Sequence, residues 1–292
     1  MELEFQAGPL QFRTQWKCMS VPQRSAEIDK YTPVPSAQRF SLNLSIEPSR
    51  AALSLPRGPV TENPDNWRAW EEGGGVVLQV WSGHSNSWAI EARITSDFSA
   101  AAIICRSDHD QHDQLEFLLA TVLRWITSLR VTLEGGVLLH GALIGFTESG
   151  VCVLGTGPSG AGKSTLSSFF LERRSFAVWT DETTIVLPFG KSWHAFGTPW
   201  SGMLEVAKNE GGKLGALCFL EKAPEHCLET IGKEQAYLRI VKELYLPPWR
   251  ETFTERALEN LQRLIDEVPS RVLYFSKSPS VVDFLSEELV KL

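Results

Sequence analysis

Residues 151–174 read VCVLGTGPSGAGKSTLSSFFLERR, and they form the most informative segment of the chain. The first six residues, Val151 to Thr156, are mostly apolar and predict a strand. The glycines at 157, 160 and 162 predict a tight loop, because glycine reaches backbone angles closed to other residues and places no Cβ beside an anion. A helix is expected from Lys163. The spacing matches the phosphate-loop pattern, and the flanking elements supply its strand–loop–helix context.

A loop of this kind binds the phosphates of a nucleoside triphosphate. Its amides and the N-terminus of the following helix point at the phosphate oxygens. Lys163 adds a positive charge, and the Ser164 hydroxyl is placed to hold Mg²⁺. A glycine- and serine-rich turn that matches by chance is the alternative, which the flanks disfavour. We therefore expect ATP and Mg²⁺ as cofactors, with these nucleotide-binding residues: Gly157, Pro158, Ser159, Gly160, Ala161, Gly162, Lys163, Ser164 and Thr165.

The composition narrows the class of protein. The chain has 292 residues, 43% of them hydrophobic and 22% charged, as in ordinary globular proteins. A formal net charge of -7, without any basic run, argues against nucleic acid or an anionic membrane as the main partner. No apolar run approaches the roughly 20 residues that span a bilayer, and the first residues lack the order of a signal peptide. Five scattered cysteines fit reduced thiols, so we expect a cytoplasmic protein.

We expect two domains, residues 1–134 and 135–292. In the first domain, alternating apolar and polar residues predict short strands, and a single apolar stripe then predicts one helix over 112–134. Asp and His residues at 108–113 precede this helix, and they either cap it, which we favour, or bind a metal ion. In the second domain a hairpin joins the phosphate-loop strand to an antiparallel neighbour. The expected fold class is α/β, with a mixed sheet and a mostly β N-terminal part.

Three further residues are candidates for catalysis. Asp181 and Glu182 stand at the end of a short predicted strand, soon after Lys163. Phosphate-loop proteins place an acidic residue at such a position to hold Mg²⁺, and a second carboxylate can take the proton of an attacking hydroxyl. The alternative is that both are ordinary turn residues. His140 lies in the strand antiparallel to the loop strand, where it either faces the phosphates or is a core histidine.

Leu139-His140-Gly141, the hairpin, the glycine loop and the Asp181-Glu182 pair together resemble HPr kinase/phosphorylase and its relatives. That family shares its fold with the ATP-dependent phosphoenolpyruvate carboxykinases. The resemblance covers residues 136–292 and implies a phosphate-loop kinase core of that type. It implies Asp181 as the general base, His140 and Lys163 as the other catalytic residues, and Glu182 with Ser164 as metal ligands. It also makes a homo-oligomer an option, because the relatives often assemble.

The chain departs from that family after the acidic pair. The loop Gly197-Thr-Pro-Trp-Ser-Gly202 occupies the region of the family's own signature. One aromatic and two hydroxyl side chains suit an acceptor pocket, which we assign to Thr198, Trp200 and Ser201; the alternative is a packed turn. Arg239 and Arg250 are weak candidates for stabilising charge in the transition state.

These features predict an ATP-dependent kinase that transfers the γ-phosphoryl group to a hydroxyl of a small molecule or of a peptide or protein serine. The alternative is a nucleotide-dependent regulatory protein with weak ATPase activity. A carboxykinase-like reaction is disfavoured, because the additional metal-binding and substrate-binding residues that it needs cannot be found.

Overall fold

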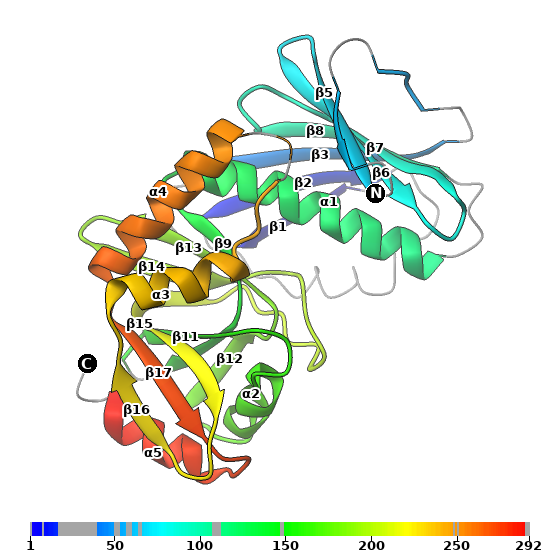
Figure 1. Cartoon of the computed structure of the whole chain (residues 1–292). Helices are drawn as coiled ribbons and strands as arrows, with labels where there is room; N and C mark the ends of the chain where they lie inside the picture. The colour runs from blue at the N-terminus through cyan, green and yellow to red at the C-terminus, as the bar shows by residue number, and fades with distance from the viewer. Residues whose placement is uncertain are drawn as a thin grey trace. The chain divides into compact units, whose positions relative to one another are not determined.

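The computed structural model of the chain describes residues 2–7, 9–16, 40–49, 53–56, 60–63, 66–106, 112–146, 149–247, 249 and 251–289. These residues form two compact units (Figure 1). The first unit contains Met1–Arg130 together with Leu246–Thr254, and the second contains Val131–Tyr245 together with Glu255–Leu292. The chain therefore leaves the first unit, builds most of the second, and returns to the first for nine residues before it ends in the second.

The first unit is built on a mixed eight-stranded sheet with the strand order β1-β2-β3-β8-β7-β6-β5-β4 (Figure 1). The β2–β3 and β3–β8 pairs are parallel and the other pairs are antiparallel. The strands are β1 (Glu2–Ala7), β2 (Leu10–Trp16), β3 (Phe40–Ser49), β4 (Thr61–Asn63), β5 (Trp67–Glu72), β6 (Gly75–Ser82), β7 (Ser87–Ile94) and β8 (Ala100–Arg106). Helix α1 (His112–Leu133) occupies the stretch expected to be helical.

Contacts between aromatic rings explain why the segment Leu246–Thr254 belongs to the first unit. The Trp249 ring contacts those of Trp67 and Trp125, with centroid separations of 5.9 and 5.2 Å. Phe253 makes an edge contact with Phe98 at 4.7 Å. Aromatic pairs at such distances add about 0.5–1.5 kcal/mol each beyond the burial of their surface. The aromatic rings of this segment thus fix it to the first unit. No local sequence pattern predicts these contacts.

The second unit carries the glycine loop on another mixed sheet. Its main order is β12-β10-β11-β15-β14-β13-β9, and β17 and β16 extend it from β15. The β11–β15 and β15–β17 pairs are parallel, and the others are antiparallel. The strands are β9 (Val137–His140), β10 (Ala142–Phe146), β11 (Val151–Thr156), β12 (Phe176–Thr180), β13 (Thr183–Phe189), β14 (Ser192–Gly197), β15 (Gly211–Lys222), β16 (Cys227–Thr230) and β17 (Ser270–Phe275). The helices are α2 (Lys163–Leu171), α3 (Lys233–Ile240), the 3-10 helix η2 (Val241–Glu243), α4 (Glu251–Glu267) and α5 (Ser280–Leu289).

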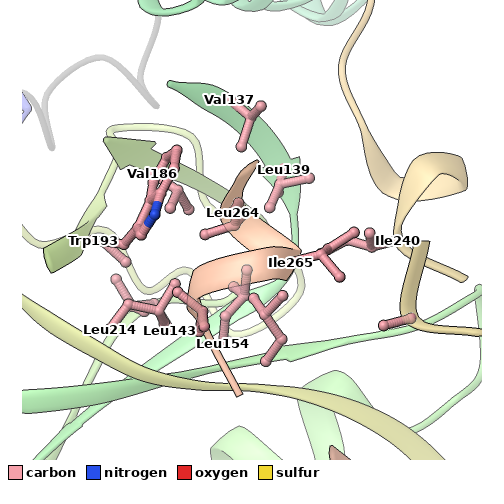
Figure 2. Close-up of a cluster of buried hydrophobic side chains, with 14 of the residues drawn as sticks. Val137, Leu139, Leu143, Leu154, Val186, Trp193, Leu214, Ile240, Leu264 and Ile265 are labelled. Atoms are coloured by element: carbon pink, nitrogen blue, oxygen red, sulfur yellow. The ribbon is translucent and has the colours of Figure 1, made fainter. Parts of the chain in front are cut away.

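One side of this sheet is closed by the apolar face of α4. Leu264 and Ile265 point into a cluster with Val137, Leu139 and Trp193 from the sheet (Figure 2). All five side chains are buried. Full burial of an aliphatic side chain contributes about 1.5–3 kcal/mol relative to its exposure in water, so this cluster is a main source of the unit's stability.

The expected fold class is wrong. The described residues are mostly β, in two mixed sheets, one of them curled into a half-barrel, and they do not form an α/β kinase core. The reason lies in the connections. Strands β12 to β15 follow one another through turns and loops, whereas an α/β core needs a helix between successive strands. The expectation was based on the strand–loop–helix segment that contains α2. Within the described residues, no helix is both long enough and apolar enough to cross a membrane.

Asn260 provides a stability prediction for the second unit. Its buried Nδ2 donates to the carbonyls of Thr132 and Gly136, each at 3.0 Å, and so holds the start of β9 against α4. Asn260→Leu leaves both carbonyls without this donor, and we expect a loss of about 1–3 kcal/mol in the free energy of unfolding. Urea denaturation measures this loss. Glu259→Ala, at the exposed neighbouring position, is the control; equal stability of the two variants would contradict the account.

Candidate active site

The glycine loop joins β11 to α2 in the second unit (Figure 1). Gly160 and Gly162 have φ values of 80° and 110°, in the region that only glycine occupies without strain. A β-carbon on Gly162 would also lie 2.7 Å from the ring of Phe275, which ends β17. Gly162 is therefore required both by its backbone angle and by packing. The strand and the helix expected on either side of the loop are both present.

Lys163 is the first residue of α2, and it reaches back over the loop. Its Nζ donates hydrogen bonds to the carbonyls of Gly157 at 2.5 Å and Pro158 at 3.4 Å. Burial lowers the pKa of this amine, and the nearby charges of Glu243 and Glu182 oppose that shift. The amine is thus bonded to carbonyls of the loop itself.

His140 lies between two carboxylates at the end of β9. Its Nε2 is 3.5 Å from Oε2 of Glu182, and its Nδ1 is 3.2 Å from Oε2 of Glu243. The hydrogen bonds to Glu182 and Glu243 raise the pKa of His140 to about 9, although burial works in the opposite direction. The imidazole is therefore protonated at neutral pH, and it is poorly suited to act as a base there. Thr156 of β11 also donates to the His140 carbonyl, at 3.0 Å, which ties this residue to the strand before the glycine loop.

Glu243 was missed in the sequence. It belongs to η2, and the residues just after it are fixed to the edge of β9: the Tyr245 N–H donates to the Leu138 carbonyl at 3.0 Å, and Leu244 forms a bridge with Leu139. The Glu243 side chain is only 9% exposed. No motif marks a lone glutamate so far along the chain from His140, and only the pairing of the Leu244–Tyr245 segment with β9 brings the two together.

Asp181, the predicted general base, contacts the loop after β14. Its side chain is buried, with 2% exposed. Oδ1 accepts the N–H of Gly202 and Oδ2 accepts the N–H of Leu204, both at 2.7 Å. Each carboxylate oxygen of Asp181 therefore already accepts a hydrogen bond from a backbone amide. Glu182, in contrast, keeps 29% of its side chain exposed beside His140.

The three predicted acceptor-pocket residues lie in the loop after β14. Thr198 is fully buried and donates to the carbonyl of Thr183 at 2.7 Å. Trp200 is 8% exposed, so its ring belongs mainly to the interior. Ser201 is half-buried. The structure thus brings this loop against the acidic pair, but the side chains of Thr198 and Trp200 are buried.

The remaining candidates contribute less. Ser164 is half-buried in the first turn of α2. The described residues contain no group of three or more His, Cys, Asp or Glu side chains that could hold a metal alone. Of the acidic and histidine cluster, residues 108–111 lie outside the described residues, and α1 begins at His112. Arg239 pairs with Glu221, and Arg250 lies outside the described residues.

Replacing Asp181 with asparagine should loosen the loop after β14. An amide group offers one acceptor oxygen where the carboxylate offers two, so one of the two loop N–H groups would face another donor. A buried donor without a partner costs about 1–3 kcal/mol. We expect lower stability in urea and faster hydrogen exchange at the amides of Gly202 and Leu204. Asp283→Asn, at an exposed position on α5, is the control. Unchanged exchange at both amides would contradict the assigned role.

Comparison with known proteins corrects the expected relationship. The model of the family described as SynChlorMet cassette protein ScmC matches residues 103–273, more than half of the chain, and the chain belongs to this family. The resemblance to HPr kinase/phosphorylase was wrong, since no family of HPr kinases or phosphoenolpyruvate carboxykinases was found. The motifs that suggested it are short and occur within a mostly β unit. No curated protein matches the chain in sequence.

Proposed function

We propose that this member of the SynChlorMet cassette protein ScmC family binds ATP at Gly157–Thr165 and transfers the γ-phosphoryl group to a hydroxyl of a small molecule or a peptide. One observation carries the proposal: Lys163 of the glycine loop, Glu182, His140 and Glu243 converge, although they come from four separate segments. A loop alone would support nucleotide binding only. A loop facing an ordered set of acids and a cation supports chemistry on the bound phosphate.

Charge neutralisation is the main task of the site. Phosphoryl transfer leaves little covalent chemistry to the protein, so positioning and electrostatic stabilisation account for most of the rate. Lys163 and the loop amides would bind the β- and γ-phosphate oxygens. The protonated His140, oriented by Glu243, would supply a second positive charge beside Glu182. When Mg²⁺ is bound, it neutralises phosphate charge, and the Ser164 hydroxyl would hold it together with the phosphate oxygens.

Glu182 is the better candidate for the base. In the transfer, the acceptor oxygen forms a bond to the γ-phosphorus and the bond to the bridging oxygen breaks. ADP leaves with that electron pair, and Glu182 takes the hydroxyl proton. We assign this role to Glu182 because it is partly exposed, whereas Asp181 is buried and holds two amides. The imidazolium of His140 disfavours a metal ion on the same carboxylate, since the two cations would repel each other.

Buried thiols in the described part of the chain support a cytoplasmic setting for this reaction. Cys152, Cys218 and Cys227 form no disulfide with one another. Burial raises the pKa of Cys152 and of Cys218 to about 12, so both stay protonated and unreactive. Reduced cysteines of this kind are usual in the cytoplasm.

The experiment is an acceptor screen with Mg-ATP. The full chain is incubated with pools of metabolites and serine peptides, and products with one added phosphate group are sought by mass spectrometry, while ADP release is followed in parallel. We expect ADP release to rise with an acceptor and a phosphorylated product to form. ATP turnover that no acceptor changes would contradict the kinase proposal and favour a regulatory ATPase.

A further inference from the structure

The loop after β14, in which Gly202 lies against the acidic pair, exposes one large apolar side chain. Met203 is 89% exposed, more than any other large hydrophobic residue that the structure describes. Its two neighbours, Gly202 and Leu204, are the residues whose amides Asp181 holds. Met203 is therefore presented to solvent from a backbone that is fixed on both sides.

Several further contacts keep this loop in place. The Glu205 N–H donates to the Gly202 carbonyl at 3.2 Å and closes a turn. Glu205 itself has a φ of 55°, a left-handed conformation that is uncommon for a residue other than glycine. Beyond it, the Lys208 N–H donates to the Trp179 carbonyl at 2.8 Å. A strained backbone conformation persists only where its surroundings hold it, and such conformations cluster at functional sites.

The position of the loop connects Met203 to the proposed chemistry. A β-carbon on Gly202 would lie 2.9 Å from Oδ2 of Asp181 and 3.1 Å from Oε2 of Glu182. The backbone just before Met203 therefore runs directly against the carboxylate that we propose as the base. A hydroxyl that reaches Oε2 of Glu182 would therefore lie close to the backbone of Gly202.

We propose that Met203 selects the phosphoryl acceptor, and that the acceptor carries an apolar group next to the hydroxyl that becomes phosphorylated. The inference rests on the proposed function. A thioether side chain is flexible and polarisable, so it can pack against apolar groups of varied shape. Asp181 is then a positioning residue, because it holds the loop that presents Met203. An apolar side chain of a peptide and the alkyl part of a small alcohol share the required chemistry.

The test measures phosphate incorporation from labelled Mg-ATP with two sets of probes. One set is a series of serine peptides in which the residues flanking serine are leucine, serine or aspartate. The other compares butanol with ethanol and ethylene glycol. For the full wild-type chain, we expect the apolar probes of at least one set to exceed their polar counterparts by about tenfold in kcat/KM. The set that responds shows whether the acceptor is a peptide or a small alcohol.

The variants separate Met203 from general effects on the fold. Met203→Ser should remove the apolar preference and leave the KM for ATP unchanged, and Met203→Leu should retain the preference. Leu238→Ser, at a 59% exposed position on α3, is the matched control and should behave as wild type. A preference that survives in Met203→Ser would overturn the inference. So would a wild-type chain that uses polar and apolar probes equally, or uses neither while it binds ATP. Failure to bind ATP would instead overturn the proposed function.

Discussion

Lys163→Ala should lose phosphoryl transfer by about 10²–10³-fold, the effect of removing one preorganised donor from a charged transition state. The amine is buried over the glycine loop and already bonds to the Gly157 and Pro158 carbonyls. In the proposed complex it exchanges those carbonyls for phosphate oxygens. Burial lowers the pKa of this amine, which means that keeping the amine charged at this position costs free energy in the protein without ATP. The relief of this cost should offset the two hydrogen bonds that the substitution removes, so the variant should have a urea midpoint close to that of wild type while it loses activity.

The measurement compares kcat/KM for ATP and the urea midpoint in the variant and in Lys191→Ala. Lys191 is an exposed lysine in the turn between β13 and β14, so its loss changes the net charge equally without touching the loop. We expect the control to match wild type in both quantities. Wild-type transfer by Lys163→Ala would show that the glycine loop does not bind the transferred phosphate.

Glu182→Gln should retain ATP binding and lose transfer by about 10²–10⁴-fold, the usual contribution of a general base. The substituted side chain keeps nearly the same shape, and an amide oxygen can still accept the His140 N–H. What disappears is the ability to take the proton of the acceptor. Glu243→Gln should have a smaller effect, because Glu243 is mostly buried and contacts Nδ1 of His140, whereas Glu182 contacts Nε2.

Glu172→Gln, at the exposed end of α2, serves as the control for the loss of one negative charge. The test compares kcat with the KM for ATP. In Glu182→Gln, kcat should fall while the KM for ATP stays near the wild-type value. If Glu182→Gln transfers phosphate at the wild-type rate and Asp181→Asn does not, the proton-accepting role belongs to Asp181 after all.

Local patterns predicted the elements around the glycine loop, because those elements depend on local chemistry. The apolar run of β11, the glycines with positive φ and the helix from Lys163 all follow from residues close in sequence. The apolar stripe of α1 is a similar case. Such short patterns say little about which strands pair, and so the fold class was wrong. The run of strands from β12 to β15, without helices between them, makes the unit mostly β.

The site was only partly predictable for the same reason. Asp181 and Glu182 are neighbours in the sequence, but which of them can act as a base depends on which carboxylate the loop amides bind. The N–H groups of Gly202 and Leu204 donate to Asp181, and the Glu182 carboxylate therefore remains the candidate for the base. Glu243 reaches His140 only because the segment after η2 pairs with β9. Neither contact leaves a signal in residue spacing.

The central claim is that the loop between β11 and α2 binds a triphosphate group, and calorimetric titration with Mg-ATP tests it most directly. We predict saturable binding of one ATP per wild-type chain, clearly weakened in Lys163→Ala and unchanged in Lys191→Ala. Absence of binding to the wild-type chain, or equal affinity in Lys163→Ala, would contradict the account.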